Sequence, residues 1–236
     1  MAYDMTKFHS GLEKLGISLS EHQFEHFLQY YELLIEWNKV MNLTAITDPD
    51  GVEYKHLLDS LLCAACPEVR GRVVDVGTGA GFPGLVLKLY RPDLEVTFLD
   101  STKKKLGFIE TVLSAVSLSG ETVHARAEEA GQSAKYREKY DFATARAVSD
   151  LRNLAEYCLP FVKLGGTFLS MKSAAADAEI DGAKNALRLL GGNIAADKVF
   201  DLVENTPRRV LLIEKISQTP PKYPRPSAKI AKNPLK

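Results

Sequence analysis

The stretch "VVDVGTGAGFPG", residues 73–84, begins with two valines and an aspartate and then places four glycines within eight positions. Its valines and aspartate predict a short buried strand, and the glycines that follow predict a sharp turn into a helix. Gly77, Gly79 and Gly81 allow a tight turn and leave the backbone open to a ligand, because glycine has no Cβ. A strand, a glycine-rich turn and a helix in this order indicate a ligand site at the carboxyl end of the strand.

Short apolar segments alternate with amphipathic segments after this stretch begins. Strands are expected in "RVVDVG", "EVTFLD", "ETVHA", "DFATARA" and "TFLSMK", and helices in "PGLVLKLY", "KKLGFIETVLSAV", "DLRNLAEYCLPFV" and "AKNALRLL". This alternation is typical of a parallel sheet with helices on both faces. The last two strands, "KVFDLVE" and "RRVLLIEK", are separated only by Asn205-Thr206-Pro207, which permits only an antiparallel hairpin. We therefore predict a doubly wound α/β domain over residues 69–215 that closes with a reversed edge strand.

The segment before this domain, residues 1–68, is expected to form a helical layer. Residues 20–40 place apolar side chains on one helical face behind a Ser20-x-x-Gln23 capping box. That face consists of Phe24, Phe27, Leu28, Tyr31, Leu34 and Ile35. After the turn signal in residues 48–51, helical spacing resumes with four leucines in residues 57–62.

The bulk composition is that of an ordinary globular protein, with 30 basic and 30 acidic residues and a formal net charge of zero. No apolar run approaches the roughly 18 residues that a membrane span needs, so no membrane partner is expected. The N-terminal "MAYDMTKFHSGLEKLG" mixes acids with bases and lacks an apolar core, which argues against a secretory signal and favours the cytoplasm.

The three cysteines are Cys63, Cys66 and Cys158, an odd number that argues against a disulfide framework. "CAAC" at 63–66 is formally compatible with a redox pair or with half of a metal site. The nearest histidine is His56, and a complete metal site needs about four ligands. We expect Cys63 and Cys66 to be buried small residues on a helix, and we expect no metal site.

The C-terminal residues 216–236 are basic and rich in proline. From Lys215 onward there are six basic residues, five prolines and no acid. The bases are Lys215, Lys222, Arg225, Lys229, Lys232 and Lys236. The prolines predict that no regular helix or strand forms here. Two interpretations stay open: a solvated, frayed terminus, or a contact with a polyanion whose phosphates pair with these bases.

The glycine loop discriminates between cofactors. Gly79-x-Gly81-x-x-Gly84 formally matches the dinucleotide fingerprint, but Gly77 already occupies the strand end where that fingerprint should begin. A phosphate-binding loop for ATP would need Gly-Lys-Ser/Thr, and Gly-Phe-Pro-Gly stands there instead. Asp75 at the strand end would repel a pyrophosphate and favour a cation such as an ammonium or a sulfonium. S-adenosylmethionine (SAM) carries both of these cations.

The next strand ends in Asp100, whose carboxylate can accept both hydroxyl hydrogens of a ribose. NAD would use this acid equally well, so Asp100 supports an adenosine ligand without choosing between NAD and SAM. An acid at the end of each of two successive strands, with the glycine loop between them, favours SAM.

"VVDVGTGAGFPG" together with "TFLD" resembles the class I SAM-dependent methyltransferases. "WNKVMNLTAI", "HLLDSLL", "TARAV" and "LGGTFLSMK" are similar to the bacterial RsmG (GidB) family, in order over roughly residues 20–215. This resemblance implies a Rossmann-like, seven-stranded, mostly parallel sheet, with SAM as cofactor and S-adenosylhomocysteine as product. It also implies methylation of N7 of one guanine in the 530 loop of 16S ribosomal RNA, guanine 527 in standard numbering. The implied partner is 16S ribosomal RNA, within the small subunit or an assembly intermediate, and the protein is expected to be a monomer.

The resemblance also assigns site residues. Gly77 and Phe82 match the cofactor loop, Ala127 and Glu128 the turn beside the adenine, and Arg146 the end of the fourth strand beside cofactor and substrate. The expected cofactor-binding set is Asp75, Gly77, Gly79, Phe82, Asp100, Ser101, Thr102, Ala127, Glu128 and Arg146. Arg146 and Lys172 are also candidates for positioning the substrate. The tail continues the resemblance through "TPPKYPRP" but has fewer glycines and lysines after it than the family usually shows.

Other marked residues are interpreted more simply. His56 and Asp59, one helical turn apart, either line the mouth of the pocket or form a buried pair. Lys103, Lys104 and Lys105 begin a helix and are expected to form a solvated face. Lys172 at the end of a strand either contacts phosphate or is solvated.

The chemistry implied by the resemblance needs few catalytic residues. N7 of guanine has an in-plane lone pair and no proton, so it can attack a methyl group without a general base. Methylation of pyrimidine C5 would need a cysteine nucleophile, and methylation of adenine N6 usually uses an Asp/Asn-Pro-Pro-aromatic motif where "DFATARAV" stands. The rivals to this interpretation are a methyltransferase acting on a different RNA or a small molecule, a nicotinamide-dependent oxidoreductase and a non-catalytic RNA-binding factor.

Overall fold

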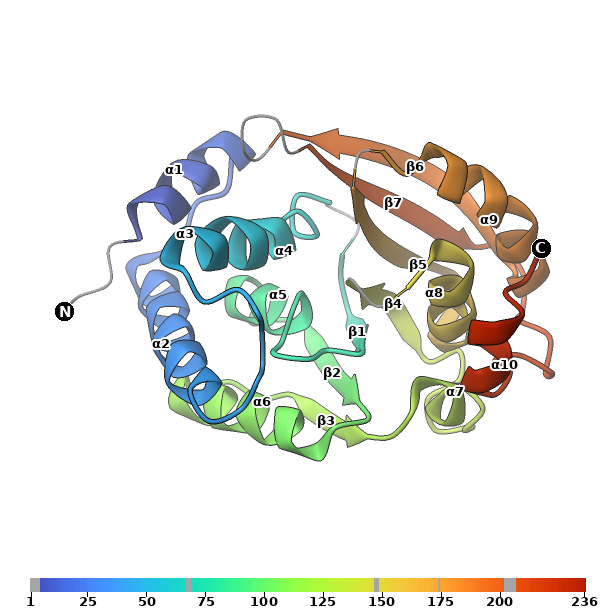
Figure 1. Cartoon of the computed structure of the whole chain (residues 1–236), viewed down its shortest axis with the longest axis horizontal. Coiled ribbons are helices and arrows are strands. Elements are labelled where there is room, and N and C mark those ends of the chain that lie inside the picture. The colour runs from blue at the N-terminus through green and yellow to red at the C-terminus, as the bar shows by residue number, and fades with distance from the viewer. Residues whose placement is uncertain (1–4, 67–68, 147–148, 174, 202–206) are drawn as a thin grey trace.

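A seven-stranded sheet lies at the centre of the described part of the protein, in the order β3-β2-β1-β4-β5-β7-β6 (Figure 1). The computed structural model describes residues 5–66, 69–146, 149–173, 175–201 and 207–236. The strands are β1 (Arg72–Val76), β2 (Glu95–Asp100), β3 (Glu121–His124), β4 (Tyr140–Ala145), β5 (Val162–Ser173), β6 (Gly192–Phe200) and β7 (Arg208–Lys215). The predicted doubly wound α/β fold is confirmed.

The predicted reversal of direction at the end of the sheet is confirmed as well. Strands β1 to β5 pair in parallel, whereas β7 pairs antiparallel with both β5 and β6. The reversed strand is therefore one position in from the edge, where β6 lies. Strand β6 begins at Gly192, earlier than expected, and the end of the predicted strand with Asn205 and Thr206 lies outside the described residues.

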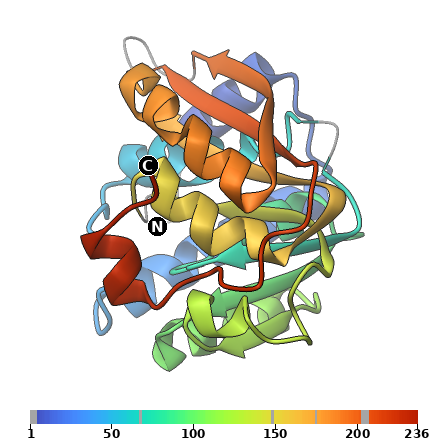
Figure 2. The ribbon, with the colours of Figure 1, turned by 90° about the vertical axis from the view of Figure 1, so that its right-hand side faces the viewer.

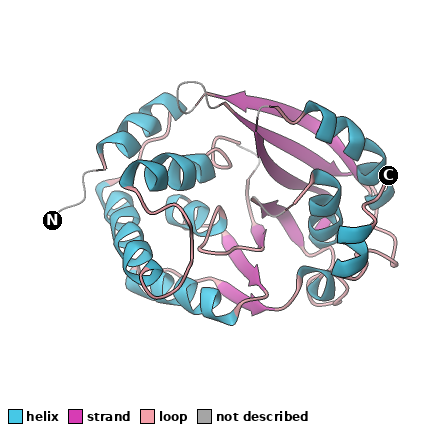
Figure 3. Ribbon diagram, viewed as in Figure 1, coloured by secondary structure: helices cyan, strands magenta, loops and turns pink. Residues whose placement is uncertain are grey.

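Helices cover both faces of the sheet, because successive strand residues point to opposite sides. Val73 packs into one hydrophobic cluster and Val74 into the other. The first face carries α1 (Thr6–Leu15), α2 (Glu21–Asn38), α3 (Pro49–Gly51), the π-helix η1 (Val52–Leu58), α4 (Asp59–Leu61), α5 (Gly84–Tyr90) and α6 (Lys103–Ala115). The second face carries α7 (Ala127–Ala130), α8 (Leu151–Cys158), the short 3-10 helix η2 (Leu159–Phe161) and α9 (Asp177–Leu190). Figure 3 shows the same layers by type of element.

The N-terminal helical layer packs directly on the glycine loop. The predicted capping box of α2 is confirmed: the Gln23 backbone N–H donates to Ser20 Oγ, and the Ser20 N–H donates to the Gln23 side chain. Helix α2 buries Phe27, Tyr31 and Leu34 as its pattern predicts. Its fully buried Tyr30 donates a hydrogen bond of 2.6 Å to the carbonyl of Ala80 inside the loop. The layer therefore has a polar contact with the loop as well as an apolar one.

The cysteines are buried, as expected, but two of them do not lie on a helix. Helix α4 ends at Leu61, and Cys63 and Cys66 lie in the turns that follow it. Cys158 is the last residue of α8. All three are free thiols, and burial raises the pKa of Cys63 and Cys158 well above the usual range.

The C-terminal segment, residues 216–236, packs against the second face, so of its two open interpretations the frayed terminus is wrong (Figure 2). Tyr223, Ile230 and Leu235 are buried. A short helix, α10 (Ser227–Lys232), forms between Pro226 and Pro234, in the longest part of the segment that contains no proline. The clustered prolines stop regular structure only before this helix. Among the described residues, no helix is long and apolar enough to span a bilayer.

Candidate functional site

The glycine loop after β1 adopts backbone angles that only glycine adopts easily. Gly77, Gly79 and Gly81 have φ values of +72°, +59° and +98°. A Cβ on Gly81 would lie 2.6 Å from the Cβ of Leu85. The N–H groups of Gly77 and Thr78 both donate to the carbonyl of Leu99, at 2.8 and 3.0 Å. The loop is therefore fixed to the end of β2.

Asp75 holds this loop together from the inside. Its carboxylate is fully buried, and one oxygen accepts hydrogen bonds from the Thr78 hydroxyl at 2.6 Å and the Gly84 N–H at 2.9 Å. The second oxygen is buried and has no hydrogen-bond partner among the described residues. Burial raises the pKa of Asp75 to about 6, although both hydrogen bonds oppose that shift. Contrary to the expectation from sequence, this side chain does not line the pocket described below.

Asp100 lies at the carboxyl end of β2 and faces the pocket. One of its oxygens accepts from the Gly79 N–H at 3.0 Å, and the other accepts from the Thr102 N–H at 2.8 Å. A carboxylate can accept about four hydrogen bonds, so each oxygen keeps capacity for a further donor. Asp100 thus orients the glycine loop and can still receive two hydroxyl groups.

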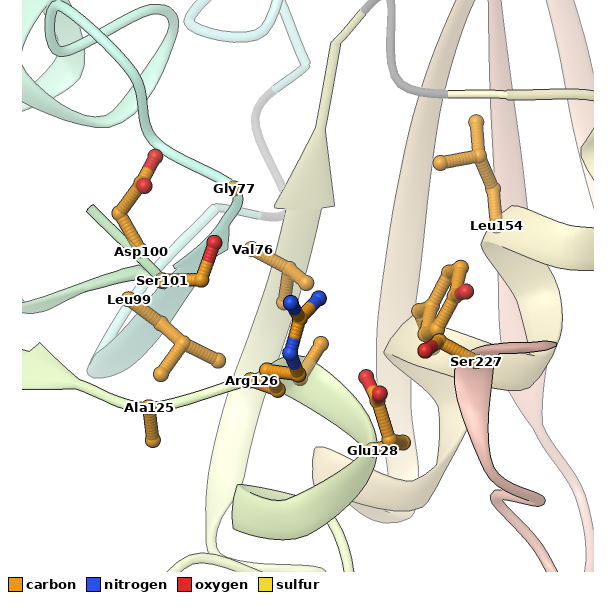
Figure 4. Close-up of a pocket in the computed structure, with 12 residues that line it drawn as sticks. Val76, Gly77, Leu99, Asp100, Ser101, Ala125, Arg126, Glu128, Leu154 and Ser227 are labelled. Atoms are coloured by element: carbon orange, nitrogen blue, oxygen red, sulfur yellow. The ribbon is translucent and has the colours of Figure 1, made fainter.

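Five of the predicted residues meet in one pocket at the carboxyl edge of the sheet (Figure 4). They are Gly77, Asp100, Ser101, Ala127 and Glu128. Seven further lining residues were not predicted: Val76, Leu99, Ala125, Arg126, Leu154, Tyr157 and Ser227. Three of these, Val76, Leu99 and Arg126, adjoin predicted positions in the chain and could have been found by extending the motifs.

The pocket has the donor set and the walls that suit an adenosine. Val76, Leu99, Ala125 and Leu154 offer apolar surface for a flat ring, and the Asp100 carboxylate offers acceptors for a ribose. The residues present therefore fit the adenosine half of SAM. The described residues contain no group of three or more His, Cys, Asp or Glu side chains placed to hold a metal ion.

Arg146 lies just beyond β4, away from the pocket lining and inside a cluster of polar side chains. We call Arg146, His56, Asp59, Phe82 and Arg208 the Arg146 cluster. The Arg146 guanidinium donates to the Asp59 carboxylate at 3.2 Å and to the Lys55 carbonyl at 2.8 Å, and lies 4.7 Å above the Phe82 ring. Arg208 donates to the other oxygen of Asp59 at 2.9 Å. Two guanidinium groups thus share one carboxylate that is only 10% exposed.

His56 completes this cluster as a neutral imidazole. Its Nδ1 lies 3.0 Å from a guanidinium nitrogen of Arg146, which can only donate, so Nδ1 must accept. The Lys55 carbonyl is 3.2 Å from the same nitrogen, but the charged guanidinium is the stronger partner. Nε2 then carries the proton and donates to the Thr44 hydroxyl at 2.7 Å. Burial, aided by the charge of Arg146, lowers the pKa of His56 to about 4.

Of the two interpretations of His56 and Asp59, the buried one is closer to the structure: both residues are buried, and Arg146 links them by contacting each. Phe82 stacks on the His56 ring with centroids 4.3 Å apart, so it too lies in this cluster. Thr102 caps α6 and Gly79 binds Asp100, and neither lines the pocket. Their roles toward a cofactor stay predictions.

Lys172 is held by partners within the protein. Its side chain is only 9% exposed, pairs with Glu179 at 2.6 Å and donates to the Ser149 carbonyl at 2.9 Å. The interpretation of Lys172 as a solvated side chain is therefore wrong, because Glu179 of α9 reaches the same strand end, and its contact with a substrate phosphate stays a prediction. Lys103 and Lys104 are exposed, as expected for a solvated helix start.

The family model described as "GidB: rRNA small subunit methyltransferase G" matches residues 23–200. A ribosomal RNA small subunit methyltransferase G from Alkaliphilus metalliredigens is 45% identical over 230 residues, which cover 96% of each chain. The protein of the same name from Halalkalibacterium halodurans is 45% identical over 236 residues, covering 98% of this chain and 99% of the other.

Solved structures show the same fold at low identity. A 16S rRNA (adenine(1408)-N(1))-methyltransferase from Catenulisporales acidiphilia, solved with its cosubstrate SAM, aligns with a TM-score of 0.50 at 15% identity. The alignment covers 69% of this chain and 93% of that one. A structure from echinomycin biosynthesis aligns with a TM-score of 0.52 at 14% identity, covering 66% of this chain and 81% of the other.

Proposed function

Because the chain belongs to the family of rRNA small subunit methyltransferase G, a SAM-dependent family, we propose that it methylates N7 of one guanine in 16S ribosomal RNA. The target is the guanine of the 530 loop. The protein acts as a monomer in the cytoplasm, on the small subunit or on an assembly intermediate. The cofactor residues proposed are the predicted set, with Asp75 acting from inside the loop.

The observation that carries this proposal is the pocket at the ends of β1, β2 and β3. Gly77, Asp100 and Glu128 follow three successive strands and line one pocket. A ligand that spans these strand ends can place its ribose on Asp100 and its base between Leu99 and the start of α7. The Arg146 cluster lies at the end of β4, the next strand along the edge.

The side chains present suit a reaction that needs no general base. Bound SAM supplies an electrophilic methyl group on a sulfonium. The nucleophilic N7 has no proton to lose, so the protein has to position it and to tolerate a developing positive charge. Nδ1 of His56 already accepts a hydrogen bond from the Arg146 guanidinium, so its lone pair is occupied and His56 is unsuited to act as a base. The fully buried Cys63 and Cys158, with raised pKa values, are unsuited to the thiolate chemistry of pyrimidine methylation.

The test of the target atom uses chemical cleavage. The protein is incubated with methyl-labelled SAM and, in parallel, free 16S ribosomal RNA, assembly intermediates and mature small subunits. Borohydride and aniline then break the RNA only at 7-methylguanosine. One break in the 530 loop is expected. Label incorporated without a break would contradict N7, and a lack of label in all three RNAs would contradict the ribosomal substrate.

The proposed binding of SAM is tested by substituting Asp100. Asp100→Ala should weaken SAM binding by about 1.5 to 3 kcal/mol, the range for hydrogen bonds to charged groups. Because Asp100 also holds the Gly79 and Thr102 N–H groups, Asp100→Asn serves as a second variant that keeps one acceptor oxygen. Asp93→Asn is the control, because Asp93 is an exposed acid just before the first residue of β2, at the end opposite to Asp100. Calorimetry showing unchanged affinity in Asp100→Ala would remove the ribose assignment.

A further inference from the structure

The C-terminal segment is attached to the second face by a buried ion pair. Glu156 of α8 is fully buried, and its two carboxylate oxygens accept from Nε and Nη2 of Arg225 at 2.7 and 2.6 Å. The backbone N–H of Arg225 donates to the same carboxylate at 2.9 Å. A bidentate pair of this kind fixes both the position and the orientation of the guanidinium. Arg225 therefore has one defined place along α8.

A second attachment fixes the backbone just before Arg225. One guanidinium nitrogen of Arg137 donates to the carbonyls of Gly131 and Tyr223, at 2.9 and 2.8 Å. The other donates to the carbonyls of Thr219 and Pro220, at 2.7 and 3.2 Å. Residues 219–225 are thus held through their main chain, which a proline-rich segment can offer without forming a helix or a strand.

Together these attachments place Ser227 at the cofactor pocket. Ser227 follows Arg225 by two residues and begins α10, whose Ile230 is fully buried. It lines the pocket on the side of Glu128 and Leu154 (Figure 4). Ala228, the next residue, is exposed and is not among the residues that line the pocket. Ser227 is far from the glycine loop in the sequence, and the two lie at one pocket only in the folded protein.

We propose that the C-terminal segment forms one wall of the adenosine pocket and that Ser227 is a cofactor-contacting residue in that wall. The proposal rests on the proposed use of SAM. A ligand that contacts the docked C-terminal segment stabilises the docked state. By the same coupling, docking of the segment raises the affinity for the ligand. Cofactor binding and the order of residues 219–235 are therefore coupled.

The direct test compares two matched substitutions on α10. Ser227→Leu adds bulk on the pocket side, and Ala228→Leu adds similar bulk on the exposed side. S-adenosylhomocysteine is titrated into each purified full-length variant by calorimetry. We expect Ser227→Leu to weaken binding by about tenfold or more, a loss of roughly 1.4 kcal/mol. Ala228→Leu should bind like the parent protein, and both should keep its melting temperature.

Equal affinities in the two variants would overturn the proposal. Failure of the parent protein to bind S-adenosylhomocysteine would instead count against the proposed function, so the two failures are distinguishable. If Ser227→Leu lowers the melting temperature, the proposal is tested by hydrogen exchange of the parent protein instead. Saturating S-adenosylhomocysteine should then slow exchange at the amides of α10 and leave those of α2 unchanged. Equal exchange at α10 with and without the ligand would also overturn the proposal.

Discussion

The N-terminal helical layer and the C-terminal segment cover opposite faces of one sheet and are held there by different means. The N-terminal layer contributes a continuous row of buried apolar side chains, including Phe8, Phe27 and Leu34. The C-terminal segment contributes only a few, notably Tyr223 and Leu235. It is fixed instead by discrete polar attachments, the Glu156–Arg225 pair and the Arg137 guanidinium.

Both regions nevertheless reach the carboxyl edge of the sheet. The N-terminal layer meets it through the Arg146 cluster, and the C-terminal segment meets it through Ser227. A region can therefore be well ordered without a periodic apolar pattern when a few buried charges are fully paired. We expect the two regions to respond differently to substitution, since apolar packing is lost gradually and a buried ion pair is lost with one side chain.

The largest effect is expected where one substitution removes the attachment of the C-terminal segment. Glu156→Gln leaves the Arg225 guanidinium without its carboxylate, in a place that is only 14% exposed. We expect the free energy of unfolding to fall by about 3 kcal/mol, the lower end of the range for breaking a buried ion pair, because Arg225 can still reach solvent. Urea denaturation measures the loss. Limited proteolysis should cut residues 216–236 first.

The matched control for this prediction is an exposed pair. Asp181 and Lys184 lie on α9 with side chains that are 70% and 66% exposed, so Asp181→Asn should leave stability unchanged within error. A Glu156→Gln protein as stable as the Asp181→Asn protein would contradict the view that the ion pair fixes the segment.

A smaller loss is expected when the polar link of the N-terminal layer is broken. Asp59→Asn removes the charge shared by Arg146 and Arg208, while the apolar contacts of the layer remain. We expect a loss of about 2 kcal/mol in unfolding free energy, within the range for hydrogen bonds to charged groups. The methylation rate should fall further, because Arg146 is no longer held in one position. Asp50→Asn, at an exposed acid of the same layer, is the control. Unchanged methylation by Asp59→Asn would contradict a positioning role for Asp59.

Arg146→Lys tests the same cluster from the other side. Arg146 contacts the Lys55 carbonyl, His56, Asp59 and Phe82, and a lysine cannot reproduce the planar fork of the guanidinium. We therefore expect the methylation rate to fall. We also expect the free energy of unfolding to fall, by about as much as in Asp59→Asn. Full stability in Arg146→Lys would show that the fork is not needed to hold the cluster together.

The fold could be predicted because its signals are local. Alternating apolar strands and amphipathic helices predicted the parallel sheet, and the short link before β7 predicted its reversal. The capping box at Ser20 predicted the start of α2, and the glycine loop predicted the site. Each of these patterns spans fewer than about 20 residues, the range within which periodicity carries information.

The rest could not be predicted because its partners are far apart in the chain. Arg225 and Glu156 are separated by 69 positions, and Arg208 and Asp59 by 149. No local pattern shows that such charges will meet. For the same reason the sequence does not show that Lys172 is paired with Glu179 or that Ser227 reaches the pocket. The inward direction of Asp75 also depends on tertiary structure, because the Thr78 hydroxyl and the Gly84 N–H draw its carboxylate into the loop.

The stability of the protein should also depend on pH through the N-terminal layer, because the titrating imidazole of His56 belongs to that layer. His56 has a pKa of about 4 in the folded protein and about 6.5 when unfolded. As the pH falls through this window, the unfolded chain gains a proton that the folded protein does not, so the free energy of unfolding falls. Asp75 opposes this change, since its raised folded pKa of about 6 favours the folded state as the pH falls toward 4.

His56→Gln removes the first contribution and keeps an acceptor for Arg146. The advantage of the parent protein over this variant should therefore shrink by about 1 kcal/mol between pH 6.5 and pH 4. The full pKa shift would give more, but Arg146 can move away from a protonated imidazole. Urea denaturation at several pH values measures the difference. A difference that stays constant with pH would show that His56 does not titrate in this window.

The smallest effect concerns the lysines that the C-terminal segment presents to solvent. Lys229 and Lys232 are exposed on α10 and do not line the pocket. If they bind phosphates, Lys229→Gln with Lys232→Gln should reduce the slope of RNA affinity against salt by about 0.7 to 0.9 for each phosphate that is no longer neutralised. Affinity for S-adenosylhomocysteine should not change.

Truncating the segment cannot serve this purpose, because it would also remove Ser227 and the buried Tyr223. Lys14→Gln, at an exposed base on α1, is the control for a general change in charge. An unchanged slope in the double variant would mean that the segment serves the cofactor pocket without contacting RNA, whereas a reduced slope with intact cofactor binding would assign its two sides to two ligands.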